Sequence, residues 1–258
     1  MSCLPVTDKT LPRFREVCAC ERLFGSRSLC AHIAGTAQSF LLEDALPAAL
    51  SLTGGVLTVV SPGIPDLPAL ERFILEHNEI IEVDSTLALC TQLQEKLGGD
   101  LESSFFMRCD APVFPEEDSG IRILPSPAPE IVFGILQGSH PYYQKHLQFA
   151  PWSTELKRWQ ELGLTELYAL EVEGQLVGTG RILSQDDLTG AIGAVAVLPE
   201  YRNRGYGRQM SAFLTRRVLE LGKTPVLISG YDAVSALYRS IGYQETGRWG
   251  ELYFHRCH

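Results

Sequence analysis

The sequence predicts an α/β protein whose mixed sheet is flanked by helices. Between residues 188 and 242 the apolar pattern reads strand, helix, strand, helix. The first 110 residues also alternate short apolar runs with helical patterns, so both halves of the chain carry the same signal. No apolar stretch approaches the roughly 20 residues that a membrane-spanning helix requires.

The length of the chain predicts two domains. It has 258 residues, and a domain takes about 150 residues as a soft average. We expect the boundary between residues 110 and 130, where prolines interrupt any long regular element: Pro112, Pro115, Pro125, Pro127 and Pro129. The expected division is an N-terminal α/β domain over residues 1–115 and a second domain over residues 120–258.

The first domain alternates strand-like and helical segments. Strands are expected at residues 39–42, 48–52, 56–60, 80–83 and 104–109, and helices at residues 68–77 and 87–97. Residues 49–57 can be laid over residues 169–177, and both segments read as a hairpin around glycine. Either the first domain is a degenerate copy of the second, or two hairpins of a common kind are alike by chance.

The run from Val195 to Gly207 joins a buried strand to a helix through a basic, glycine-containing turn. Gly205 and Gly207 let a ligand approach the backbone closely. The helix begins at about Tyr206, and its first amides lack intrahelical partners, which favours an anion in front of them. Residues 202–223 hold six basic residues and one acid, in a chain whose net charge is −9. The turn is therefore predicted to hold a pyrophosphate.

The residues after this turn continue the α/β pattern. Apolar side chains recur at helical spacing, and they are Met210, Phe213, Leu214, Val218 and Leu221. Gly222 ends this helix, residues 225–229 form a short buried strand, and Asp232 is a candidate N-cap of a helix that ends at Gly242.

Two motifs in this region resemble those of the GNAT superfamily of acyl-CoA-dependent N-acetyltransferases. The first is Arg202-Asn203-Arg204-Gly205-Tyr206-Gly207, which resembles the family's Arg/Gln-x-x-Gly-x-Gly/Ala motif after the fourth strand. The second is Leu237-Tyr238-Arg239-Ser240-Ile241-Gly242-Tyr243, which resembles the Leu-Tyr-x-x-x-Gly-Phe/Tyr end of a later helix. Their order and separation, one helix plus one strand, also fit. The resemblance covers about residues 120–258.

The resemblance implies a GNAT-like mixed sheet flanked by helices. Residues 131–137 then resemble the first strand, and residues 166–172, 175–183 and 188–197 correspond to strands two to four. Helices are expected near residues 141–149 and 153–162. The first domain would be a diverged, non-catalytic copy, because its corresponding turn, residues 61–66, has no arginine and its prolines have no amide to donate.

The resemblance also implies acetyl-CoA as co-substrate and a set of residues that bind it. Backbone groups of the fourth strand and the basic turn contribute, together with side chains near the second motif: Val195, Val197, Arg202, Asn203, Arg204, Gly205, Tyr206, Gly207, Arg208, Asp232, Ser235 and Tyr238. Where the family often has an asparagine that contacts CoA, seven residues before the tyrosine, this chain has Tyr231. Asp232 or Ser235 is the candidate to replace that contact, although Asp232 fits equally as an N-cap.

The implied chemistry is transfer of an acetyl group to an amine by direct attack. The amide of Val197 is expected to stabilise the thioester oxygen, and the Tyr238 hydroxyl to act as general acid toward the departing thiolate. The proton of the amine, whose pKa is near ~10.4, needs a base. Residues 188–198 contain no carboxylate, so Glu171, Glu173, Asp186 and Asp187 are candidates through water, or simply surface acids.

Aromatic residues offer an acceptor groove or part of the core: Tyr142, Tyr143, Phe149, Trp152, Trp159 and Trp249. The acceptor is expected to be a small-molecule or peptide amine, and the sequence does not indicate an oligomeric state. The alternative function is a non-catalytic acyl-CoA sensor or regulatory module, because no residue stands out as the base.

Composition narrows the partners and the compartment. Seven cysteines without Cys-x-x-Cys spacing argue against a disulfide framework and against a zinc site, so no metal is expected. The acidic balance argues against binding to nucleic acid or to an anionic membrane. The first residues lack a basic segment followed by an apolar one, so we expect a cytoplasmic protein.

Overall fold

The computed structural model describes residues 3–116, 120–230 and 232–255, with the backbone alone at positions 146, 232 and 233. Its contacts divide the chain into two compact units. Unit 1 comprises residues 3–106, 228–230 and 245–255, and unit 2 comprises the described parts of residues 107–227 and 232–244. This division differs from the expected one, because the strand that follows the second motif packs in unit 1.

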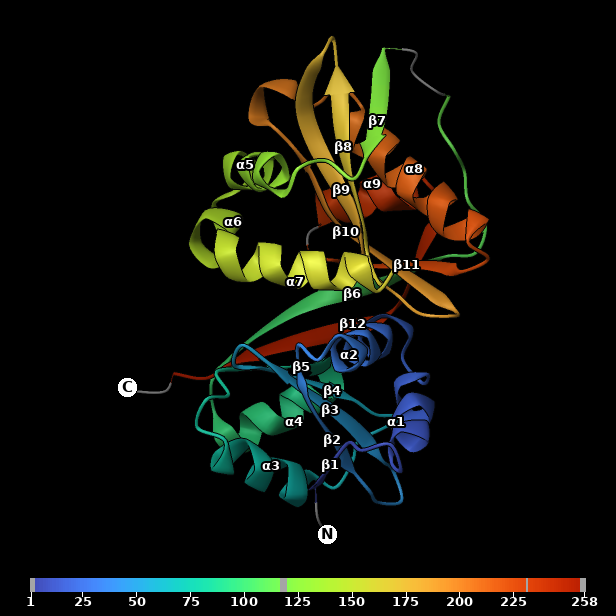
Figure 1. The fold of residues 1–258 in the computed structure, drawn as a ribbon. Helices are drawn as coiled ribbons and strands as arrows, with labels where there is room; N and C mark the ends of the chain where they lie inside the picture. Colours follow the sequence, from blue (N-terminus) through green and yellow to red (C-terminus); the bar gives the residue numbers. More distant parts are fainter. Residues whose placement is uncertain (1–2, 117–119, 231, 256–258) are drawn as a thin grey trace. The chain divides into compact units, whose positions relative to one another are not determined.

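Unit 1 contains a mixed sheet with helices between its strands. In chain order the elements are β1 (Cys3–Pro5), α1 (Leu11–Cys18), α2 (Arg22–Ala34), β2 (Gln38–Leu42), β3 (Ala48–Thr53), β4 (Val56–Val60), α3 (Leu67–Glu76), β5 (Glu82–Thr86), α4 (Leu87–Leu97), β6 (Asp100–Cys109) and β12 (Tyr243–Tyr253). The strand order is β1-β2-β3-β4-β5-β12-β6, with β4 and β5 parallel. The late strand β12, red in Figure 1, thus lies between β5 and β6, two strands that come much earlier in the chain.

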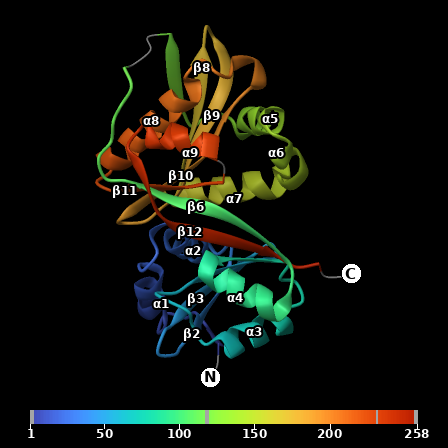
Figure 2. The ribbon, with the colours of Figure 1, turned by 180° about the vertical axis from the view of Figure 1, so that it is seen from behind.

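Both faces of this sheet are covered. Leu50, Leu57 and Val83 pack against α3 and α4, which lie in front of the strands in Figure 2. The other face packs on α1 and α2, where Phe24 stacks on Trp249 with ring centroids 3.5 Å apart. The sequence prediction did not include α1 and α2. Helix α2 is buried around most of its circumference, so it has no one-sided apolar stripe to reveal it.

Unit 2 contains a series of strands of the same mixed kind, with helices between them. Its elements are β7 (Ile121–Pro125), α5 (Pro129–Ser139), α6 (Pro141–His146), α7 (Phe149–Glu161), β8 (Glu166–Val172), β9 (Gln175–Gln185), β10 (Thr189–Val197), the 3-10 turn η1 (Pro199–Tyr201), α8 (Tyr206–Glu220), β11 (Thr224–Ser229) and α9 (Asp232–Arg239). The strands of unit 2 follow the order β7-β8-β9-β10-β11, and β10 and β11 are parallel.

The expected first strand at residues 131–137 is wrong, because this segment is part of helix α5. Pro129 occupies the first turn, where its missing amide costs nothing, and Val132, Ile135 and Leu136 form a buried stripe at helical spacing. The first strand of this sheet is β7, inside the stretch that the prolines predicted to be a linker. Pro125 ends β7, which pairs only with β8 among the strands of unit 2.

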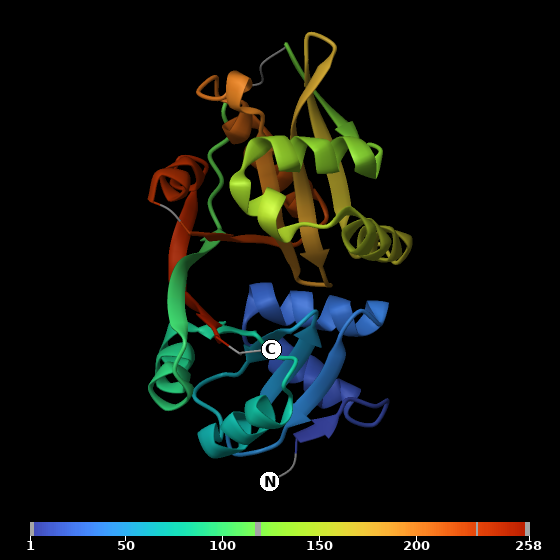
Figure 3. The ribbon, with the colours of Figure 1, turned by 90° about the vertical axis from the view of Figure 1, so that its left-hand side faces the viewer.

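Helices cover both faces of the second sheet as well. Helices α5, α6 and α7 pack on one face, seen from the front in Figure 3, through a core that includes Val132, Leu156 and Leu167. Helix α8 packs on the opposite face. Gly180 and Gly190 allow its close approach, because an added Cβ would lie 2.7 Å from Met210 and 2.6 Å from Val218, respectively.

The two halves of the chain repeat one order of elements. β2-β3-β4-α3-β5-α4-β6 corresponds to β8-β9-β10-α8-β11-α9-β12, with the same antiparallel and parallel pairings among the first four strands of each series. The hairpin similarity noted in the sequence is shifted by one strand, since residues 49–57 form the β3–β4 turn and residues 169–177 the β8–β9 turn.

Candidate active site

Strands β10 and β11 separate along their length. They pair only from Thr189–Thr224 to Ala191–Val226, although β10 continues to Val197 and β11 to Ser229. On its other edge β10 stays paired with β9, with a bulge between Gly193 and Ala196 in which Ala194 has φ +50°. The bulged half of β10 therefore has one edge that β11 does not cover.

The amide of Val197 lies on this uncovered edge. The next residue, Leu198, donates its amide to the carbonyl of Val177 on β9 at 2.9 Å. Successive backbone groups of a strand point in opposite directions, so the amide and carbonyl of Val197 point away from β9. The carbonyl of Val197 accepts a hydrogen bond from Arg202 Nε at 3.1 Å, which agrees with this orientation.

The basic turn has the backbone expected of an anion site. Asn203 (φ +62°) and Gly205 (φ +83°) are both left-handed, and Gly205 is the N-cap residue of α8. No side chain caps this helix, within the residues that the structure describes. An added Cβ at Gly205 would meet nothing within 4 Å, so the space beside this residue is open. The amides from Tyr206 onward thus face a position that favours negative charge.

The arginines of the turn hold it in place. Arg202 also donates to the carbonyl of Ser139, the last residue of α5. Arg208 donates to Ser240 Oγ at 3.1 Å and to the Ser240 carbonyl at 3.3 Å, just beyond α9. Arg204 donates to the carbonyl of Glu200 and lies over the Tyr201 ring. The sequence predicted that the backbone amides of this turn hold the pyrophosphate and that its arginines add positive charge. In this structure Arg202 and Arg208 also connect the turn to the ends of α5 and α9.

Tyr238 projects from α9 into a buried position. It is 7% exposed, and its ring meets that of Tyr243 edge-on with centroids 5.8 Å apart. Burial raises the pKa of the Tyr238 hydroxyl to about 12, with a further contribution from Tyr143 and an opposing one from Ser211. The hydroxyl is therefore protonated at neutral pH, as a proton donor must be.

The other residues predicted near the second motif are placed less favourably or lie outside the description. Ser235 is fully buried within unit 2. Asp232 is the first residue of α9, and its side chain lies outside what the structure describes, as does all of Tyr231. Val195 is half-buried on the bulged part of β10.

Two of the four candidate bases are engaged elsewhere, and the other two lie in turns. Glu171 forms an ion pair with Arg122 at 2.8 Å. Asp186 accepts hydrogen bonds from the amides of Leu188 and Thr189. Glu173 has a left-handed backbone (φ +51°) in the β8–β9 turn. Asp187 is exposed in the turn before β10. Among the candidate groove aromatics, Trp159 and Trp249 are at most 4% exposed and belong to the core.

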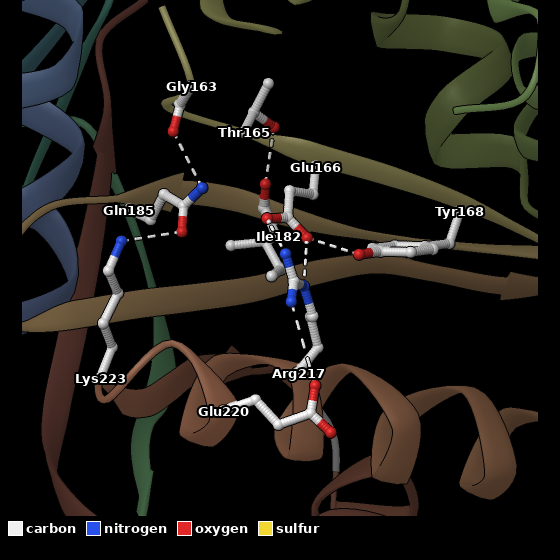
Figure 4. A network of polar contacts seen from close by, with 9 residues as sticks. All are labelled: Gly163, Thr165, Glu166, Tyr168, Ile182, Gln185, Arg217, Glu220 and Lys223. Atoms are coloured by element: carbon white, nitrogen blue, oxygen red, sulfur yellow. Dashed lines mark hydrogen bonds and ion pairs between the residues drawn. The ribbon is translucent and has the colours of Figure 1, made fainter. Parts of the chain in front are cut away.

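A polar network clamps the far end of α8 to the sheet (Figure 4). Arg217 binds Glu166 through two hydrogen bonds of 2.9 and 3.0 Å, and Tyr168 donates to the same carboxylate. Burial would raise the pKa of Glu166, but the hydrogen bonds from Arg217 and Tyr168 outweigh it and lower the pKa below its usual value. Glu166 is thus a fixed anion that anchors α8, and it has little capacity to accept another proton.

The corresponding region of unit 1 is closed. Asp66 caps α3 and accepts the amide of Ala69 at 3.2 Å, so a carboxylate already occupies the anion position. Where β4 and β5 stop pairing, Ser85 Oγ donates to the Val59 carbonyl at 2.8 Å and bridges the two strands. Unit 1 thus has the elements of unit 2 without the open strand edge or the free helix terminus.

Comparison with known proteins identifies the family of this region. The profile of the Acetyltransferase (GNAT) family matches residues 132–243, which include β10, the basic turn and α9. Residues 132–243 form a GNAT acetyltransferase domain. The family carries out acyl transfer from acyl-CoA, so the GNAT domain is an acyltransferase domain. The two sequence motifs therefore identified the family correctly.

Solved structures of GNAT proteins match nearly the whole chain. A tandem GNAT protein from the clavulanic acid biosynthesis pathway has a TM-score of 0.65 and 11% identity, covering 100% of this chain and 99% of that one. A GCN5-related N-acetyltransferase from Kribbella flavida has a TM-score of 0.61 and 17% identity, covering 90% of this chain and 97% of that one. Another from Sphaerobacter thermophilus has a TM-score of 0.62 and 16% identity, covering 97% of this chain and 94% of that one. These likenesses show that the chain has the GNAT fold, repeated in tandem. No curated protein matches the chain in sequence.

The described residues contain neither a group of side chains arranged to hold a metal ion nor a membrane-spanning helix. No group of three or more His, Cys, Asp or Glu side chains in residues 3–116, 120–230 and 232–255 is arranged to hold a metal ion. None of the helices described there is long and apolar enough to cross a bilayer.

Proposed function

We propose that this protein transfers an acetyl group from acetyl-CoA to an amine, either a small molecule or a peptide, by direct attack. The observation that carries the proposal is the uncovered edge of β10, which leads through the basic turn to the uncapped start of α8. One end of this path offers strand-like hydrogen bonds, and the other offers an anion site. That sequence of groups suits a ligand with an amide-containing arm and a pyrophosphate.

Acetyl-CoA would bind along this path as an additional strand. The amide groups of its arm would form hydrogen bonds with the backbone of Val195 and Val197. Its pyrophosphate would accept hydrogen bonds from the backbone amides between Arg204 and Arg208. The arginines of the turn would contribute mainly by holding the loop and by their positive charge.

The reaction forms a carbon–nitrogen bond and breaks the carbon–sulfur bond of the thioester. As the amine attacks, the Val197 amide stabilises charge on the thioester oxygen, and the Tyr238 hydroxyl donates a hydrogen bond to the leaving sulfur. A tyrosine with a pKa of about 12 is a weaker acid than a thiol with a pKa of about 8.5. The ammonium first loses one proton to water, and the neutral amine then attacks. Tyr238 donates its proton to the sulfur and takes up the second proton that the nitrogen releases, so CoA leaves as the thiol and Tyr238 ends neutral.

A second function, that of an acyl-CoA sensor, is favoured by one observation. The four carboxylates considered as bases are paired, turn-bound or exposed, and none has been brought to the β10 edge. A protein of this kind would bind acetyl-CoA without turnover. Release of free thiol in the presence of an amine panel separates the two functions.

The test compares Gly205→Val with Gly222→Val in the full chain. Both glycines are left-handed, and at both an added Cβ meets nothing within 4 Å, so the backbone strain is matched. Gly205 precedes α8 and Gly222 follows it. Calorimetry should show acetyl-CoA affinity reduced by about tenfold or more, roughly 1.4 kcal/mol, in Gly205→Val only.

Equal affinity in the two variants would reject the binding path. Tight binding of acetyl-CoA with no thiol release from any amine would instead reject the transferase and favour the sensor.

A further inference from the structure

Unit 1 contains a group of carboxylates that the active site does not use. Glu82 and Asp84 lie on β5, Glu251 on β12 and Glu102 on β6. The register pairs Glu251 with Asp84 and Tyr253 with Glu82, so these side chains share one face of the sheet. We call Glu82, Asp84, Glu102 and Glu251 the acidic cluster.

Asp84 forms the buried end of the acidic cluster. It is 6% exposed, and its side chain is hydrogen-bonded to Glu82, but its Oδ1 atom has no hydrogen-bond partner among the residues that the structure describes. A buried carboxylate oxygen without a partner is costly, because it loses water and gains nothing in return. Toward solvent the cluster opens, since Glu82 and Glu251 are half-buried and Glu102 is exposed.

The acidic cluster has an excess of negative charge. Burial, followed by the nearby Glu82 carboxylate, raises the pKa of Asp84 well above its usual value. Burial, Glu82 and Glu102 raise the pKa of Glu251 to about 7. Burial and the surrounding carboxylates, Glu251 first, also raise the pKa of the Tyr253 hydroxyl. Arg27 of α2 partly offsets this charge and lowers the pKa of both Asp84 and Glu251.

We propose that the acidic cluster binds an organic ammonium group, with the Asp84 carboxylate at the buried end as its acceptor. The ammonium supplies hydrogen-bond donors to the unpartnered oxygen and positive charge to the surrounding carboxylates. Residues 3–116, 120–230 and 232–255 contain no arrangement of carboxylates that converges on one metal position, so an alkylammonium fits better than a metal ion. The site lies wholly in unit 1 and does not depend on the proposed transferase reaction.

The experiment titrates the full chain with n-butylamine and with spermidine, without acetyl-CoA. Alkylamines stay protonated below a pKa of about 10.4, whereas Glu251 loses its charge as the pH falls through about 7. Binding should therefore be measurable by calorimetry at pH 8 and several-fold weaker at pH 6. Asp84→Asn and Glu251→Gln should each weaken it by about tenfold or more at pH 8.

Two control variants define the location. Glu95→Gln removes an equal charge from an exposed position on α4 and should leave binding unchanged. Glu220→Gln removes an equal charge from an exposed position on α8 of unit 2 and should also leave it unchanged. If Asp84→Asn does not fold, Glu251→Gln and Glu102→Gln carry the test, because both positions lie nearer to solvent.

The proposal is overturned if neither amine binds at pH 8, or if binding is equal in the wild type and the cluster variants. Equal competition by magnesium chloride would replace the ammonium with an inorganic cation and would also overturn it.

Discussion

At the scale of single residues, a substitution of Tyr238 can distinguish the proposed chemical step from the binding of acetyl-CoA. The sequence motif predicted its position, and the structure adds that it is buried, protonated at neutral pH and packed against Tyr243. Val197 is positioned by backbone geometry alone, because strand alternation and the missing β11 partner together orient its amide. A side-chain motif cannot reveal such a group, and only the resemblance to the family implied it.

Tyr238→Phe should lower kcat by about 100-fold, the usual scale for a positioned proton donor, while acetyl-CoA affinity changes little. The substitution keeps the ring and its packing, so the melting temperature should stay close to that of the wild type. A single-turnover measurement of acetyl transfer checks the chemical step directly. An unchanged single-turnover rate would show that Tyr238 is a core residue.

At the scale of elements, the placement of α8 decides where the anion site lies. Arg217 and Glu166 fix its far end, while Gly180 and Gly190 let its middle approach the sheet. The sequence predicted the start of α8 at Tyr206 and the apolar stripe, because the periodicity is strong there. It did not predict the glycine contacts, since a glycine in a strand gives no sign of what packs against it.

Gly180→Ala should destabilise unit 2 by about 1–3 kcal/mol, because the new methyl would lie 2.7 Å from Met210 and 2.8 Å from Leu214. Gly134→Ala on α5 is the matched control, as an added Cβ there meets nothing within 4 Å. Chemical denaturation of both variants checks this. Equal midpoints would mean that α8 shifts without cost.

The same scale shows where sequence patterns failed. Residues 131–137 are apolar enough to read as a strand, and only Pro129 in the first turn signals a helix. The prolines after residue 110 suggested a linker, yet Val113 donates its amide to the Ile241 carbonyl at 2.7 Å, just beyond α9. Local composition cannot show a contact with a segment 128 residues later in the chain.

At the scale of the whole molecule, the two copies of the repeat differ at the proposed site. Unit 2 keeps the uncovered strand edge and the free helix terminus. In unit 1, Asp66 and Ser85 close both features. The sequence predicted a non-catalytic first domain from its missing arginines, and this stays a prediction.

Strand β12 follows unit 2 in the chain, but most of it belongs to unit 1. A single boundary in the sequence therefore does not separate the two units. A chain that ends after Gln244 should lose the fold of unit 1, because Trp249 no longer stacks on Phe24 and β5 loses its partner strand. Loss of a buried tryptophan alone costs about 3–5 kcal/mol. Hydrogen exchange should then show that protection is lost in β2 to β5.

A chain that ends after Tyr253 is the control for this truncation, since it keeps all of β12. Protection in β2 to β5 should be retained there. If the shorter chain retained the same protection, unit 1 would be stable without its late strand.

The position of β12 also has a consequence for protein synthesis. The sheet of unit 1 has β12 between β5 and β6, but about 130 residues must be translated after β6 before β12 exists. During that time β5 and β6 emerge from the ribosome with unpaired edges, which are templates for wrong pairing. Unit 1 therefore completes its folding only after nearly all of unit 2 has been made, and a chaperone that shields strand edges would act in that interval.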